Sequence, residues 1–186
     1  MFGTEESHGY VVGQYASDKV GAVATMLMAE LAADCKAKGE SLHQRLDAIY
    51  KKLGYHAERL VTQRMEGSEG MALMKKLMAK FRSDPPTELG GLPVAAIRDY
   101  QANTVTKTGG SPEPLEGPNG DLVIIDLDEG NYVAARPSGT EPKVKFYMFA
   151  YVAKEEVDDL PATKAAIEKR LDGFQQDLEK FAASVS

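Results

Sequence analysis

The succession of strand and helix patterns after residue 54 is the feature that most limits what this chain can fold into. Strand-like runs occur at 55–65, 92–100, 122–128, 132–136 and 144–152. A helical pattern at 68–82, with Met71, Met74, Met78 and Phe81 expected to point inward, separates the first two runs. Another helical pattern follows the last run. The apolar residues of that last helix have a 4-3-4-3 spacing and are Ile167, Leu171, Phe174, Leu178 and Phe181. Runs of strands followed by a helix predict an α+β fold, with helices on one face of a sheet.

The first 54 residues have a different character, because their two helical patterns have no sheet to cover. The first pattern runs over 17–38, and Gly39 stands where a C-terminal glycine belongs. The second begins at Ser41, which forms a capping box with Gln44, and ends before Gly54. The segment after Gly54, about 130 residues, is long enough for a core of its own. We therefore expect two domains, 1–54 and 55–186, the first being the helical remnant of a mixed α/β domain.

Charge and composition limit the partners. The 22 Lys and Arg residues are outnumbered by 28 Asp and Glu, for a formal net charge of −6. A nucleic-acid binder normally carries a basic face, so no nucleic-acid partner is expected. No apolar run approaches the roughly 20 residues that span a bilayer, and the N-terminus lacks the pattern of a signal peptide. Together with a single cysteine, Cys35, this favours a cytoplasmic protein with no membrane partner, no internal disulfide and no multi-thiolate zinc site.

The segment Arg136–Lys143, Arg-Pro-Ser-Gly-Thr-Glu-Pro-Lys, lies between two predicted strands and has the composition of a phosphate-binding loop. Arginine offers a bidentate fork, lysine a point charge, and backbone amides in a tight turn can form an anion-holding nest. The flanking prolines would hold the loop in shape before a ligand binds. The alternative is a polar hairpin turn, since Pro, Ser and Gly are common in turns.

A second candidate loop opens the chain at Gly3–Tyr10, Gly-Thr-Glu-Glu-Ser-His-Gly-Tyr. Its carboxylates and hydroxyl could accept hydrogen bonds from sugar hydroxyls, and a buried site of that kind discriminates strongly. An acidic surface turn or a frayed N-terminal tail is the alternative. A chain that begins inside such a loop also suggests a piece of a longer protein.

These two motifs, with Ser17-Asp18-Lys19 at the start of the first helix, resemble the C-terminal part of the α-D-phosphohexomutases, the phosphoglucomutase/phosphomannomutase family. The resemblance implies that 1–54 belongs to the third, sugar-binding domain of four and 55–186 to the fourth, phosphate-binding domain. It also implies a TATA-binding-protein-like fold for the latter. The substrate-binding residues that it implies are Glu5, Ser7, Lys19, Arg136, Ser138, Gly139, Thr140 and Lys143.

The family's phosphoserine loop and its Asp-x-Asp-x-Asp-Arg magnesium loop are absent from this sequence. Asp126 and Asp128 have the right offset, but Gly130 takes the third position, so they are expected to end a strand and set a turn. The resemblance implies that the whole enzyme moves phosphate between C1 and C6 of a hexose through a phosphoserine and a bisphosphate. It also implies that this enzyme uses Mg²⁺ and a hexose bisphosphate activator. This chain would supply no catalytic residue, metal ligand or cofactor and would be inactive alone. Its expected partners are a phosphorylated hexose and the missing N-terminal domains. A stand-alone phosphosugar- or anion-binding module is the alternative.

Overall fold

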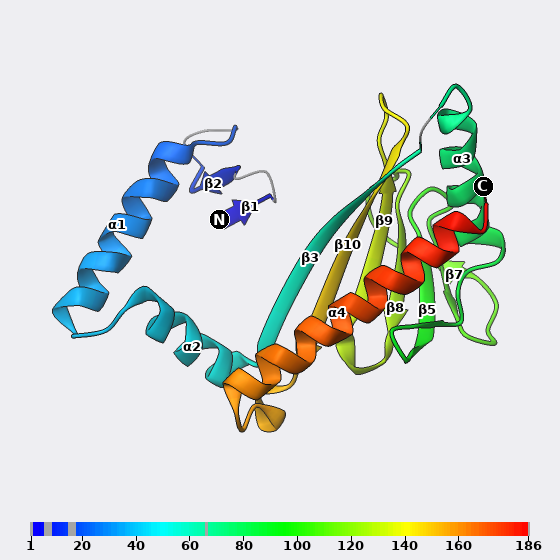
Figure 1. The fold of residues 1–186 in the computed structure, drawn as a ribbon. Helices are drawn as coiled ribbons and strands as arrows, with labels where there is room; N and C mark the ends of the chain where they lie inside the picture. The colour runs from blue at the N-terminus through cyan, green and yellow to red at the C-terminus, as the bar shows by residue number, and fades with distance from the viewer. Residues whose placement is uncertain (1, 6–8, 15–17, 66, 186) are drawn as a thin grey trace. The chain divides into compact units, whose positions relative to one another are not determined.

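The structure is a computed structural model that describes residues 2–5, 9–14, 18–65 and 67–185 (Figure 1). The chain divides into two compact units, Met1–Lys52 and Leu53–Ser186. The division lies next to the boundary expected after Gly54, while the correspondence of the units to a third and a fourth domain stays a prediction.

The first unit begins with a small sheet that the sequence analysis did not anticipate. Strand β1 (Phe2–Thr4) pairs antiparallel with β2 (Tyr10–Val12). Helix α1 (Gly21–Ala37) follows, so the predicted start of this helix at residue 17 is wrong for the described residues 18–20. Val20 is extended and donates its backbone N–H to the Tyr10 carbonyl at 2.8 Å. This bond continues the hydrogen bonding of β2 and delays the helix.

Helix α2 (Leu42–Leu53) starts as the sequence predicts. The Ser41 hydroxyl accepts from the Gln44 N–H at 3.1 Å, and the Gln44 side chain accepts from the Ser41 N–H at 2.8 Å. The two bonds confirm the capping box. Several large apolar side chains of α1 and α2 are exposed, namely Met26, Leu27, Met28, Leu31, Leu42, Leu46, Ile49 and Leu53.

The second unit is built on an eight-stranded antiparallel sheet. Seven strands follow the order β3-β10-β9-β8-β5-β6-β7, and the eighth, β4, pairs with β5. The strands are β3 (Tyr55–Arg64), β4 (Glu88–Leu89), β5 (Leu92–Asp99), β6 (Thr104–Lys107), β7 (Glu113–Pro114), β8 (Val123–Leu127), β9 (Tyr132–Pro137) and β10 (Lys143–Val152). The short 3₁₀ turns are η1 (Asp128–Gly130) and η2 (Lys154–Glu156). The long predicted strands are confirmed, whereas β4, β6 and β7 were not predicted.

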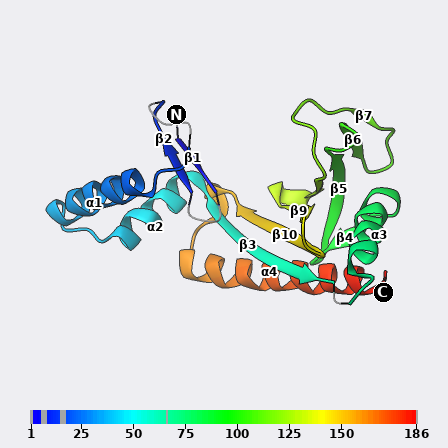
Figure 2. The same cartoon turned by 90° about the horizontal axis from the view of Figure 1, so that it is seen from above.

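Helices α3 (Gly70–Ser83) and α4 (Leu160–Ala183) lie on the same face of this sheet (Figure 2). The core forms between them and the strands, with Phe81, Phe146 and Phe174 almost fully buried. The prediction that Met71 points inward is wrong, because its side chain is 40% exposed. Leu77 is buried in its place, since the inward stripe of α3 is set by residues 74, 77, 78 and 81.

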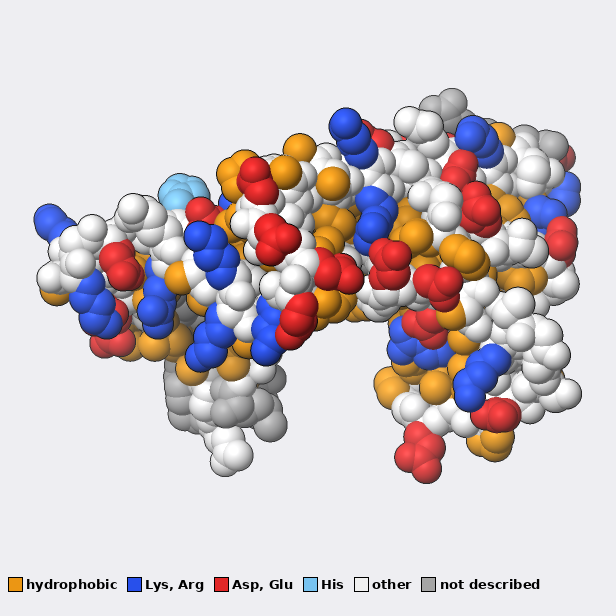
Figure 3. All heavy atoms as spheres, turned by 90° about the horizontal axis from the view of Figure 1, so that it is seen from below, with side chains coloured by type: hydrophobic (Ala, Val, Ile, Leu, Met, Phe, Trp, Pro, Cys, Tyr) orange, Lys and Arg blue, Asp and Glu red, His pale blue; other side chains and the backbone are white. Residues whose placement is uncertain are grey.

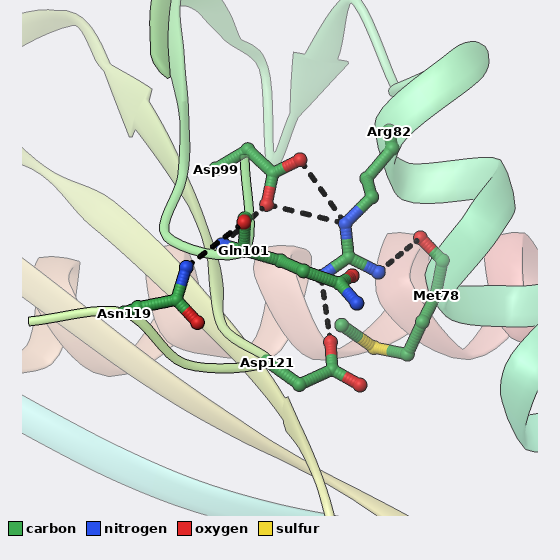
Figure 4. A network of polar contacts seen from close by, with 6 residues as sticks. All are labelled: Met78, Arg82, Asp99, Gln101, Asn119 and Asp121. Carbon is green, nitrogen blue, oxygen red and sulfur yellow. Dashed lines mark hydrogen bonds and ion pairs between the residues drawn. The ribbon is translucent and has the colours of Figure 1, made fainter. Parts of the chain in front are cut away.

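Arg82, at the end of α3, links this helix to the end of β5 (Figure 4). Its Nε lies 3.2 Å from both carboxylate oxygens of Asp99, and its Nη2 donates to Asp121 at 2.6 Å. Asp99 also accepts from the Gln101 N–H, and the Asn119 side chain donates to the Gln101 carbonyl. The network joins α3 to the ends of β5 and to the connector before β8.

The second unit thus has the α+β architecture that the sequence predicts, with a large antiparallel sheet and helices on one face. Among the described residues, no helix is both long and apolar enough to cross a bilayer. The face shown in Figure 3 carries acidic and basic side chains side by side.

Candidate functional site

The predicted phosphate-binding residues lie in the hairpin loop 138–142 between β9 and β10 and at the adjoining strand ends, where Arg136 is on β9 and Lys143 on β10. The Ser138 N–H donates to the Lys143 carbonyl at 2.9 Å, and the Ser138 hydroxyl accepts from the Glu141 N–H at 3.3 Å. The Pro142 carbonyl accepts from the Met65 N–H at 2.8 Å, which ties the loop to the end of β3. The structure therefore holds the loop by backbone bonds at both of its ends.

The tip of this loop leaves donors available. Within the described part of the chain, the N–H groups of Gly139 and Thr140 have no hydrogen-bond acceptor, and Arg136 has no ion-pair partner. Gly139 is exposed, and a Cβ built on it would meet nothing within 4 Å. Consecutive backbone N–H groups facing open space are the donors that an anion-binding nest uses.

The strand register brings more cations to this site than the motif contains. Side chains alternate between the faces of a strand, so residues paired across strands share a face. Arg136 pairs with Lys145, and Lys143 pairs with Arg64 of β3. The sequence analysis missed Arg64 and Lys145. Lys145 could have been found from its two-residue spacing to Lys143 on a predicted strand, which places both on one face. The position of Arg64 near the loop depends on the pairing of β3 with β10, which the sequence did not show.

Among the described residues, the Glu141 carboxylate lies beside two of these cations. It pairs with the Lys143 ammonium, and its other oxygen lies 3.8 Å from the Arg64 guanidinium. The hydrogen bond from Lys143, then the charges of Lys143 and Arg64, hold the pKa of Glu141 below its ordinary value. Of the described residues at the loop end, Arg64, Arg136 and Lys143 outnumber the Glu141 carboxylate, which is the charge balance that an anion site requires.

The second predicted loop assembles a different pair in the first unit. The Lys19 ammonium donates to a Glu5 carboxylate oxygen at 2.7 Å, and the Glu5 N–H donates to the Gly9 carbonyl at 3.0 Å. A Cβ on Gly9 would lie 2.3 Å from the Lys19 Cδ and 2.5 Å from the Glu5 carboxylate, so these two flexible side chains would have to shift to admit a larger residue. Ser7, the other predicted sugar contact, lies outside the described residues.

The described residues do not fit a magnesium site. No group of three or more His, Cys, Asp or Glu side chains that could hold a metal occurs among them. The Asp126 carboxylate instead accepts two bonds from the Arg98 guanidinium, at 2.8 and 2.5 Å. Asp126 and Asp128 fall at the end of β8 and in η1, the strand end and turn that the sequence analysis expects.

Sequence comparison finds related proteins of known function. The chain is 36% identical over 149 residues to a phosphoglucomutase of Staphylococcus aureus and 35% identical over 149 residues to one of Staphylococcus epidermidis. Each match covers 80% of this chain but 27% of the relative. The chain thus spans about a quarter of the length of the curated relatives that it matches. No family model matches the chain.

Structural comparison agrees with the sequence relationship at the level of the fold. The open form of parafusin, an exocytosis-sensitive phosphoprotein of Paramecium described as a phosphoglucomutase, matches 95% of this chain and 30% of its own, with a TM-score of 0.52 at 16% sequence identity. At this identity the likeness concerns the fold alone.

Proposed function

We propose that this chain, a relative of the C-terminal region of the phosphoglucomutases, binds a phosphorylated hexose as the substrate-holding part of a phosphohexomutase. The loop 138–142 would bind the phosphate group, with Arg136 as its main cation. The Glu5–Lys19 pair and Ser7 would contact sugar hydroxyls. The assignment of the two units to a sugar-binding and a phosphate-binding domain belongs to the same proposal, as does the TATA-binding-protein-like topology of the latter.

The observation that carries the proposal is the collection of cations and unsatisfied donors at one hairpin. Arg136, the N–H groups of Gly139 and Thr140, and the Ser138 and Thr140 hydroxyls lie within five consecutive positions. Lys143 and Lys145 follow on the next strand. Phosphate oxygens accept bonds from each of these donor types, and charge-assisted bonds are the stronger ones.

Such a site contributes positioning and electrostatic stabilisation to phosphoryl transfer. A cradle of backbone N–H groups and an arginine recognises the charge and shape of a phosphate rather than one face of a sugar. It could therefore hold the phosphate on C1 or on C6, as a reaction through a hexose bisphosphate would require. The phosphorylated serine and the metal would have to come from other parts of such an enzyme, so we expect no turnover of hexose phosphate by the 186-residue chain.

The test is calorimetric titration of the chain with inorganic phosphate and with glucose 6-phosphate. Replacing Arg136 with Ala should weaken binding of both ligands by about 1–3 kcal/mol, because a charge-assisted hydrogen bond is lost. Arg45→Ala removes an exposed guanidinium from α2 and should leave both affinities unchanged. Equal affinities of the Arg136→Ala chain and the unmodified chain would contradict the proposed function.

A further inference from the structure

Strand β3 is the outermost strand at one side of the large sheet, and among the described strands only β10 pairs with it (Figure 1). The Met65 N–H donates to the Pro142 carbonyl in the same register as the strand pairs, so the odd-numbered residues of β3 direct their backbone groups to β10. The N–H and carbonyl groups of the even-numbered residues therefore point outward. The side chains of these residues are also exposed, and they are His56, Glu58, Leu60, Thr62 and Arg64.

The two edges of the sheet differ in how well they are protected against another strand. Strand β7, at the far edge, has two residues, and one of them is Pro114. Strand β3 has ten residues, contains no proline and pairs with β10 along its whole length without a bulge. A long, regular edge strand is a template for pairing with another chain, whereas a short strand or a proline discourages it.

A second β3, placed antiparallel to the first, would meet complementary charges in one register. Hydrogen bonds across this edge require even-numbered residues to lie opposite even-numbered residues. A two-fold axis at Val61 meets this requirement and sets Glu58 of each copy opposite Arg64 of the other, with Leu60 opposite Thr62. Moving the axis by one residue in either direction no longer places the two charges opposite each other.

Both charged side chains are accessible for such a pair. The Arg64 side chain is 68% exposed, and its ion-pair contact with Glu141 is a long one, at 3.8 Å. Glu58 is exposed and has no ion-pair partner among the described residues. Charges of one sign along an edge would repel a second copy, but opposite charges directly across a strand pair stabilise it.

We propose that β3 is a self-association edge, at which two copies of this chain pair antiparallel about a two-fold axis at Val61. The two sheets would become one continuous sheet, and the outward N–H and carbonyl groups between Glu58 and Arg64 would all find partners. The Gln63 side chain, which donates to the Arg64 carbonyl at 3.4 Å, would give up this long bond. The inference is independent of the function proposed for the 138–142 loop.

The first test is sedimentation equilibrium of the 186-residue chain from micromolar to millimolar concentration, where a monomer–dimer equilibrium is expected. Glu58→Arg and Arg64→Glu should each lower the association constant by about tenfold or more, because each places like charges opposite each other at two symmetric positions. The double variant Glu58→Arg/Arg64→Glu restores opposite charges and should associate like the unmodified chain. Glu116→Arg is the matched control, because it reverses an exposed charge in the connector that follows β7 and should change nothing.

The second test concerns the backbone of the same edge. Leu60→Pro removes an outward N–H without breaking a bond to β10, so the variant should fold, as circular dichroism would show, and stay monomeric. In the unmodified chain, hydrogen exchange of the outward amides should slow as the protein concentration rises. These amides belong to Glu58, Leu60, Thr62 and Arg64.

Three results would overturn the proposal. A chain that stays monomeric over the whole concentration range has no self-association edge. A dimer in which the outward amides of β3 exchange at the rate of the monomer uses another surface. A double charge reversal that associates no better than the two single reversals would show that Glu58 and Arg64 do not lie opposite each other.

Discussion

The two units use their apolar side chains in different ways. In the second unit, the stripe of α4 is buried, and Ile167, Phe174 and Leu178 are at most 1% exposed. In the first unit, α2 has an equally regular stripe, but Leu46 remains 43% exposed. Helical periodicity and a good cap are thus enough to set a helix, whereas tertiary stabilisation depends on what the stripe is packed against.

The two candidate binding loops also differ, in their balance of charge. The Glu5–Lys19 pair of the first unit brings one carboxylate and one ammonium together beside Gly9. At the 138–142 loop of the second unit, the described cations Arg64, Arg136 and Lys143 outnumber the described carboxylate, Glu141. A neutral pair suits hydrogen bonding to uncharged hydroxyls, and a cationic loop suits an anion.

The largest expected difference between the units comes from the same substitution made in each. Leu178→Ala should lower the free energy of unfolding by about 2–5 kcal/mol, because it leaves a cavity in a packed core. Leu46→Ala should stay within about 0.5 kcal/mol of the unmodified chain, because its side chain already contacts water. Urea unfolding followed by circular dichroism measures both. Similar losses for the two variants would show that the stripe of α2 is packed as tightly as that of α4.

Hydrogen exchange should sharpen the comparison residue by residue. We expect amides in α1 and α2 to exchange more than about tenfold faster than those in β9 and β10, because local opening costs less where few apolar contacts are broken. Exchange measured by mass spectrometry or NMR on the intact chain provides the test. Uniform protection across both units would contradict the difference in packing.

Much of this architecture follows from local sequence patterns. The capping box at Ser41 specifies the start of α2, and the alternation in 144–152 specifies β10, since both signals act within a few residues. The candidate loop at 138–142 also stands out in the sequence, because its hydrogen-bond donors are consecutive. In each case the residues that determine the structure are neighbours in the chain.

What the sequence did not reveal depends on contacts between distant segments. Arg64 joins the cations of the loop only because β3 pairs with β10, and the late start of α1 follows from the bond between Val20 and Tyr10. The inward stripe of α3 was misassigned at Met71 for a similar reason. Periodicity gives a face, but the position of the neighbouring strands decides which residue at its border is buried.

The smallest expected effect concerns a carboxylate that links α4 to the sheet. The Asp177 carboxylate accepts a hydrogen bond from the Gly90 N–H at 2.9 Å. The backbones approach closely here, because a Cβ on Gly173 would lie 3.1 Å from the Gly90 Cα. That backbone bond, and then Lys180, keep the pKa of Asp177 below its ordinary value of 3.8 against the opposing effect of burial. A depressed pKa stabilises the fold above the unfolded-state pKa, and this stabilisation is lost as the pH falls through the lower, folded-state value.

Asp177→Asn should therefore destabilise the chain at pH 7 by less than about 1 kcal/mol, since the carboxylate is partly exposed and screened by solvent. The difference from the unmodified chain should begin to shrink as the pH falls below 3.8 and should be smallest below the lower folded-state pKa, where the carboxylate is protonated in both states. Asp34→Asn, which removes an exposed i,i+4 partner of Lys38 in the first unit, should cost no more than about 0.5 kcal/mol. Unfolding midpoints in urea at pH 7 and at acid pH measure these differences. A penalty for Asp177→Asn that persists undiminished in acid would mean that the side chain acts through its shape rather than its charge.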